Sequence, residues 1–392
     1  MNRRYCLILA TLYAGLFGAP GRVAAQSTVP EIVDFLMTRR QLVSDDFERD
    51  RAAAAAASDA LTRALVVSLT SVPIATSSGG FVYRLNPELG TVERATDSFG
   101  GFFVERALTP GHGRAAFGLS ASTSAFDGLD QHNLRDGSFV TIANRFRDEP
   151  NPFDTESLTL RVRSSTMTAF ASVGITSRFE IGAVVPFVQL TLEGERINVY
   201  RGDSVQQAAA TATANGIGDA AIRAKAMIVA ARSGGVAVAG ELRLPTGDEE
   251  NLLGAGSMAV RLMGIGSLER RGLSLHGNAG LVRGGVSDEY TFGGAAGLAV
   301  APQVTITGEL SGRYLSELRP VVLTPAQHPS YDGVDTWRLT GGDPGRTIAN
   351  AIAGFKWNPG GTFVVAAHLR WSLTSAGLTS PLTPSIGMEY AF

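Results

Sequence analysis

From about residue 114 to the C-terminus, apolar residues alternate with polar or small residues at every second position. Phe363, Val365 and Leu369, for example, share one parity, whereas His368 and Arg370 share the other. Because successive side chains of a strand point to opposite faces of a sheet, the pattern predicts strands with one apolar and one polar face. No segment here is apolar for the roughly 20 residues that a transmembrane helix needs. Strands are therefore the elements that could cross a bilayer.

The number of strands and the lengths of their connections favour a barrel. About twelve alternating segments are predicted as strands: 114–126, 157–174, 179–199, 216–231, 236–246, 254–268, 273–283, 290–300, 304–316, 346–357, 362–374 and 384–392. Tight turns alternate with longer polar loops, at 127–156, 200–215, 247–253, 284–289, 317–345 and 375–383. Short turns on one side and longer loops on the other are typical of outer-membrane barrels. We predict an all-β fold, a transmembrane antiparallel β-barrel formed by residues 114–392.

The last predicted strand contains an alternating set of large apolar residues, namely Ile386, Met388, Tyr390 and Phe392. A terminal Phe with apolar residues at every second position resembles the assembly signal of bacterial outer-membrane barrels. The alternative is an ordinary strand that ends in Phe. Aromatic residues also fall near both ends of the predicted strands, as expected for the two interfacial girdles of such a barrel.

The N-terminus indicates export. Basic residues precede the apolar run 5–17, and Val23 and Ala25 occupy the −3 and −1 positions of a small-residue cleavage site. Residues 1–25 are therefore predicted to be a signal peptide. The single cysteine, Cys6, lies within it, so the mature chain is expected to lack disulfides and Cys-metal sites. Export and a barrel together predict localisation in the outer membrane of a Gram-negative envelope.

Residues 26–113 differ from the barrel and are predicted as a helical and irregular segment. Leu61, Leu65 and Leu69 recur every four residues, which places them on one helical face. Barrels of eight strands are filled by side chains, whereas sixteen or more leave an aqueous channel, so about twelve strands predict a narrow lumen. The segment 26–113 is either a plug in this lumen or a periplasmic segment; the sequence leaves both open.

Composition limits the partners. Only 18% of the residues are charged, against about 25% in soluble domains. The 34 basic and 36 acidic residues leave no basic excess, so a nucleic-acid partner is not expected. The expected partners are outer-membrane lipid and lipopolysaccharide, the barrel-assembly machinery and a small-molecule solute.

Strand parity predicts which polar residues face the lumen, because charges on the lipid face are costly. The candidates lie opposite the apolar face: Arg161, Arg163, Asp219, Arg223, Lys225, Glu241, Arg243, Arg261, Glu309, Arg313, Lys356, His368 and Arg370. The simpler interpretation is a salt-bridge network that rigidifies the wall, and the alternative is a role in selecting substrate.

The sequence contains no catalytic or metal-binding signature. None of the five histidines has a partner at metal-ligand spacing, and no nucleophile elbow of the Gly-x-Ser-x-Gly type occurs. We therefore expect no catalytic residues, no metal and no cofactor, and a protein that is not an enzyme.

Several turns and loops carry a family resemblance. These are residues 174–182 (GITSRFEIG), 216–219 (GIGD), 244–248 (LPTGD) and 251–254 (NLLG). Over roughly residues 160–392 the chain resembles the outer-membrane family named for the meta-pathway of phenol degradation. The resemblance implies an outer-membrane channel or transporter for small organic molecules, hydrophobic ones included. A structural or adhesive barrel is the alternative, and a barrel enzyme acting on lipid has less support.

Overall fold

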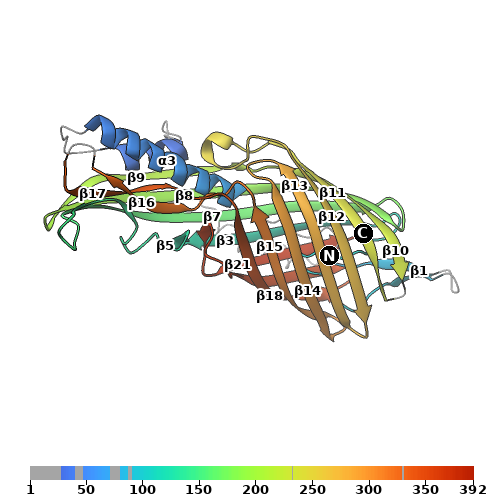
Figure 1. Cartoon of the computed structure of the whole chain (residues 1–392). Coiled ribbons are helices and arrows are strands. Elements are labelled where there is room, and N and C mark those ends of the chain that lie inside the picture. The colour runs from blue at the N-terminus through green and yellow to red at the C-terminus, as the bar shows by residue number, and fades with distance from the viewer. Residues whose placement is uncertain (1–27, 40–46, 71–79, 87–90, 232, 329–330) are drawn as a thin grey trace, which may run out of the picture.

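The computed structural model describes residues 28–39, 47–70, 80–86, 91–231, 233–328 and 331–392 (Figure 1). The predicted signal peptide, residues 1–25, lies outside the described residues. No helix in the described part of the chain is long and apolar enough to span a membrane.

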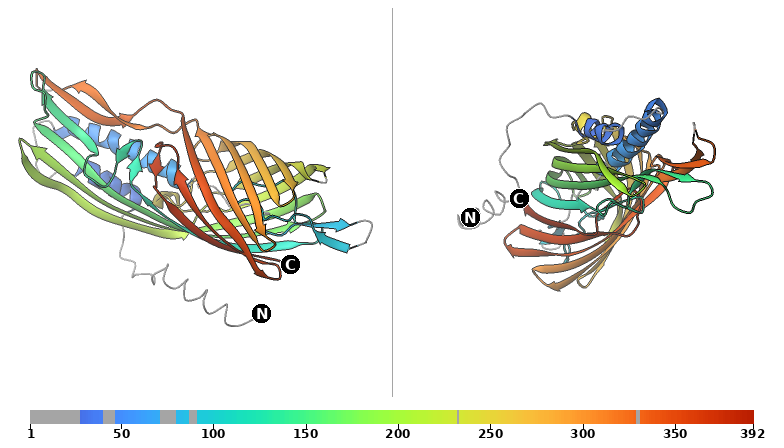
Figure 2. Two further views of the ribbon diagram at one scale, coloured as in Figure 1. Left: turned by 90° about the horizontal axis from the view of Figure 1, so that it is seen from below. Right: turned by 90° about the vertical axis from the view of Figure 1, so that its left-hand side faces the viewer.

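Twelve antiparallel strands form a closed barrel (Figures 1 and 2). In ring order they are β7 (Asp154–Gly174), β3 (Ala115–Phe126), β21 (Thr383–Ala391), β19 (Phe363–Ser372), β18 (Arg346–Gly360), β15 (Val304–Leu315), β14 (Glu289–Ala301), β13 (Leu273–Gly284), β12 (Ala259–Arg270), β11 (Gly234–Arg243), β10 (Ala221–Ala231) and β8 (Phe179–Tyr200). Pairing of β7 with β8 along their whole length closes the ring. The predicted fold class is confirmed, and each of the twelve predicted strands overlaps one strand of the ring.

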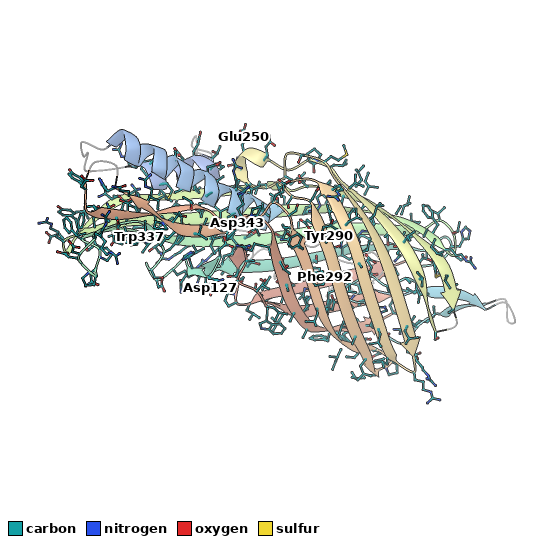
Figure 3. All side chains as sticks on the ribbon, in the orientation of Figure 1. Asp127, Glu250, Tyr290, Phe292, Trp337 and Asp343 are labelled. Carbon is teal, nitrogen blue, oxygen red and sulfur yellow. The ribbon has the colours of Figure 1, made fainter. Side chains whose placement is uncertain are left out.

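The outer surface of the barrel is apolar. Ile222, Leu262 and Leu310 expose 53%, 56% and 60% of their surface, as expected where lipid and not water is the solvent. Tyr290 and Phe292 on β14 project from the outside of the wall (Figure 3). Closure leaves no strand edge in this ring, so every strand finds its hydrogen-bond partners within the protein, which a bilayer requires.

The two longest strands extend past the barrel at the long-loop end. β7 and β8 have 21 and 22 residues, about 70 Å at the usual rise of roughly 3.3 Å per residue. Four strands pair alongside them in the extension (Figure 1): β6 (Val140–Phe146), β9 (Asp203–Ile217), β16 (Val321–Gln327) and β17 (Val334–Gly341). The sequence interpretation assigned these segments to loops, or, for the end of β9, to the following strand. In β9 the inward positions are alanines, such as Ala208 and Ala212, and alanine alternating with threonine gives little amphipathic contrast.

Two helices cover this extension (Figure 2): α2 (Val29–Thr38) and α3 (Phe47–Thr70). A capping box between Thr28 and Glu31 begins α2. Val33 and Leu36 of α2 are buried in one cluster with Leu160 and other inward residues of the extension. Gly194 on β8 permits this packing, because a Cβ there would collide with the side chain of Leu36.

Short elements close the rim at the long-loop end: β4 (Gly128–Leu129), β5 (His132–Asn133), β20 (Leu378–Thr379) and the 3-10 helix η1 (Glu249–Asn251). Between β4 and β5, the carboxylate of Asp130 accepts hydrogen bonds from the backbone N–H groups of Val321 at 2.9 Å and Gly377 at 2.7 Å. Burial raises the pKa of Asp130, although these hydrogen bonds act in the lowering direction. Three loops that are distant in sequence are thereby joined at the mouth of the barrel.

The N-terminal segment occupies both ends of the barrel and its interior. The helices lie at the long-loop end, and a hairpin of β1 (Tyr83–Asn86) and β2 (Thr91–Arg94) lies at the opposite end (Figure 1). After the hairpin, residues 96–109 run without regular secondary structure inside the barrel. The two sequence alternatives treated the segment as one unit, but its parts lie in different places. The irregular residues 96–109 lie in the lumen, and the helical part packs on the extension at the long-loop end.

Candidate functional site

The lumen is occupied by residues 96–109, which we name the plug segment. It bonds to the wall on several sides. The backbone N–H of Phe99 donates to the Thr305 hydroxyl on β15 at 3.0 Å, and that of Ala107 donates to the Ser267 hydroxyl on β12 at 2.8 Å. From β18, Nζ of Lys356 donates to a plug-segment carbonyl at 2.8 Å. Polar groups of the wall thus satisfy backbone groups of a segment that has no regular secondary structure.

The carboxylate of Glu309 on β15 fixes a turn at the centre of the plug segment. Its Oε2 accepts hydrogen bonds from the backbone N–H groups of Phe103 at 3.0 Å and Val104 at 3.2 Å. Its Oε1 accepts another from the N–H of Phe102. Gly101 begins this turn, and a Cβ at that position would collide with the Glu309 carboxylate and the carbonyl of Val104. One ionised side chain therefore holds three consecutive amides.

A buried ion network ties the plug segment to the neighbouring part of the wall. Glu105 of the plug segment lies 2.6 Å from Arg223 and 3.6 Å from Lys225, both on β10. Arg223 also pairs with Glu241 on β11 at 2.7 Å, and Lys225 pairs with Glu180 on β8 at 3.1 Å. All five side chains are almost fully buried. Removing one member would leave buried charges without a partner, which lowers the free energy of unfolding far more than the loss of a surface ion pair does.

Two cavities follow one another in the lumen. The larger, of about 170 Å³, reaches from the plug segment to the rim at the long-loop end. The smaller, of about 100 Å³, lies on the side of the short turns. Phe103 and Arg370 line both cavities. The ring of Phe103 meets that of His368 edge-on, with centroids 5.3 Å apart, so this pair narrows the passage between the cavities.

Most of the predicted lumen residues lie inside the barrel. Arg223, Lys225, Glu241, Glu309 and Lys356 contact the plug segment or its ion network, as described above, and His368 lines the smaller cavity. The larger cavity is lined by four of the predicted arginines: Arg243, Arg261, Arg313 and Arg370. Two of them are paired, Arg243 with Glu241 and Arg313 with Glu289, each at 3.6 Å.

Arg161 and Arg163 are a correction to the sequence prediction, which placed them in the lumen. Both are exposed, and Arg161 pairs with Glu193 at 3.8 Å on the outer face of the extension. The neighbouring apolar residues Leu160 and Val162 point inward, where the helices cover them. Beyond the membrane the outer face contacts water, so the polarity of the two faces of β7 is the reverse of that in the barrel.

Asp219 also lies outside the lumen cavities. Its carboxylate accepts hydrogen bonds from the backbone N–H groups of Gly247 at 3.0 Å and Ala255 at 2.8 Å. It therefore organises the loop around η1 at the rim. The GIGD and LPTGD motifs meet here, which gives these family-like residues a structural role.

Several residues of the site were not predicted. Glu180 and Glu389 have the inward parity of their strands, and the alternation alone could have identified them. Glu105 and Phe103 carry no such signal, because the plug segment has no periodicity. Within the described residues, no group of three His, Cys, Asp or Glu side chains could hold a metal ion.

A closed antiparallel ring with an apolar outer face defines a transmembrane β-barrel of the outer-membrane class. Residues 130–318 match the family model described as "Putative MetA-pathway of phenol degradation". The match spans a little less than half of the chain and confirms the family resemblance that the turn and loop motifs indicated.

Solved structures align with much of this chain at low sequence identity. The COG4313 outer membrane channel from Pseudomonas putida F1 has 12% identity and a TM-score of 0.48, covering 73% of this chain and 98% of that one. The toluene transporter TbuX of Ralstonia pickettii has 10% identity and a TM-score of 0.31, covering 72% and 90%. The transport unit of the autotransporter AIDA-I from Escherichia coli has 9% identity and a TM-score of 0.40, covering 71% and 90%. A search of the curated proteins gives no significant match.

Proposed function

We propose that this protein is an outer-membrane channel for small organic molecules and that the plug segment gates it. The observation that carries the proposal is the succession of two cavities in the lumen, separated at Phe103. A barrel that served only as a scaffold would have no need for aligned cavities on the two sides of a displaceable segment. The family description, which refers to phenol degradation, is consistent with an aromatic solute.

Passage requires the plug segment to shift. Its attachments to the wall include hydrogen bonds and ion pairs between polar groups, beside the buried side chains of Phe99, Phe102 and Val104. The hydrogen bonds of its backbone can be exchanged for bonds to water in a hydrated lumen at modest net cost. Phe103 is the side chain whose movement would join the two cavities.

The remaining expected partners belong to the same proposal. The apolar outer face would contact outer-membrane lipid, including lipopolysaccharide. The strand that carries Ile386, Met388, Tyr390 and Phe392 would be recognised by the barrel-assembly machinery. Ile386, Tyr390 and Phe392 are exposed on the outer face, where such recognition is possible. The proposal includes no catalytic step.

Planar-bilayer conductance and uptake of phenol into liposomes test the proposal. We expect Phe103→Ala to raise both, because it enlarges the passage between the cavities. Phe355→Ala is the matched control, because it removes the same atoms as Phe103→Ala but from the lipid-facing side of β18. The proposal fails if neither the wild type nor the Phe103→Ala variant, folded in lipid, conducts ions or admits phenol.

A further inference from the structure

The larger cavity has an excess of positive charge. Its lining in the described residues includes four arginines, Arg243, Arg261, Arg313 and Arg370, and two glutamates, Glu241 and Glu289. Glu241 is also shared with a fifth arginine, Arg223, at 2.7 Å. The carboxylates at this level are therefore too few to neutralise the guanidinium groups.

The excess is local to this cavity. Around the plug segment, the buried cations do not outnumber the buried anions: Arg106, Arg223, Lys225 and Lys356 lie against Glu105, Glu180, Glu241, Glu309 and Glu389. A wall that needed charge only for rigidity could have been balanced at both levels in the same way. The imbalance lies where the lumen faces the exterior, on the outer side of the plug segment.

Arg370 is the member of the cluster without a protein partner. No hydrogen bond or ion pair joins it to another residue in the described ranges, and it borders both cavities. Its electrostatic environment includes Arg313, which has the same sign. A partly buried guanidinium next to another cation loses solvation without compensation. An anion in the cavity would supply that compensation.

The rest of the lining fits the body of an organic acid. Phe103, Phe126 and Ile348 provide apolar surface, and Ser124 and Ser311 provide hydroxyl groups. A guanidinium presents paired N–H donors that match a carboxylate in a bidentate arrangement. The cavity thus combines an anion-binding group with an apolar wall.

We propose that the larger cavity is a binding site for small aromatic carboxylates, with Arg370 as the group that binds the carboxylate and Arg313 beside it. The inference builds on the proposed function, since it names the solute class that the channel would admit. Phe103 lies at the inner end of the site, so a solute held at Arg370 contacts the side chain that separates the two cavities.

Isothermal titration calorimetry on the purified full-length protein in detergent tests the site, with benzoate as the probe and benzyl alcohol as its neutral match. We expect benzoate to bind and benzyl alcohol to bind at least tenfold more weakly, because a charge-assisted hydrogen bond contributes more than this factor. Arg370→Gln should weaken benzoate binding by about tenfold or more, and Arg313→Gln by less. Arg161→Gln, on the exposed outer face, should leave it unchanged.

Equal binding of the acid and the alcohol, or unchanged benzoate affinity in folded Arg370→Gln, overturns the inference. If Arg370→Gln does not fold, Arg370→Lys keeps the charge but removes the bidentate geometry and should still weaken benzoate binding. Conductance separates this inference from the proposed function. A channel that conducts but does not distinguish benzoate from benzyl alcohol retains the function and loses the site. A protein that binds benzoate at Arg370 but never conducts retains the site and loses the function.

Discussion

Glu309 offers the sharpest test of the gate, because one carboxylate holds three consecutive amides of the plug segment. Glu309→Gln keeps the size of the side chain and replaces one acceptor oxygen with an NH₂ group. That group would face backbone N–H donors and could not bond them. One or two hydrogen bonds to a charged acceptor are lost, each contributing about 1.5–3 kcal/mol. We take about 2–4 kcal/mol as the expected loss for the closed arrangement.

At about 1.4 kcal/mol for each factor of ten, this loss raises the population of the displaced plug segment by roughly thirtyfold or more. Single-channel recording in planar bilayers measures it as open probability. Glu193→Gln is the matched control, since Glu193 lies exposed on the outer face of the extension and pairs with Arg161. The gating argument is refuted if Glu309→Gln and Glu193→Gln, both with heat-modifiable gel mobility, show the open probability of the wild type.

Two further predictions concern folding. Lys225→Met leaves Glu180 and Glu105 without their shared cation and should lower the free energy of unfolding by about 3–5 kcal/mol. Urea titration of the lipid-reconstituted protein measures this free energy. A decrease below about 1 kcal/mol would contradict a stabilising role of the ion network. Phe392→Ala should slow insertion by the assembly machinery in vivo while leaving unassisted folding into detergent nearly unchanged, because the backbone N–H of residue 392 can still donate to the carbonyl of Ala115. Equal insertion rates for variant and wild type would show that the terminal aromatic is not a signal.

The plug segment shows where prediction from sequence reached its limit. Residues 96–109 have no periodicity, and their position depends on charges contributed by strands more than a hundred residues away, such as Arg223 and Glu309. Only folding of the complete wall brings these groups to one level of the lumen. The sequence could therefore offer a plug and a periplasmic segment as alternatives, with no basis for choosing the arrangement that the structure has.

The amino-acid sequence by itself determined the ring. Alternation of period two identifies twelve strands, and the lengths of the connections order them, because each strand must present one face to lipid and pair with its neighbours. Tertiary structure decided what lies on each face beyond the membrane. Leu160 and Arg161 follow the same alternation as the barrel, yet the apolar residue points inward beneath a helix and the charged one outward to water. Alternation along a strand indicates that its two faces differ. The solvent at each depth and the elements packed there decide which face is the interior.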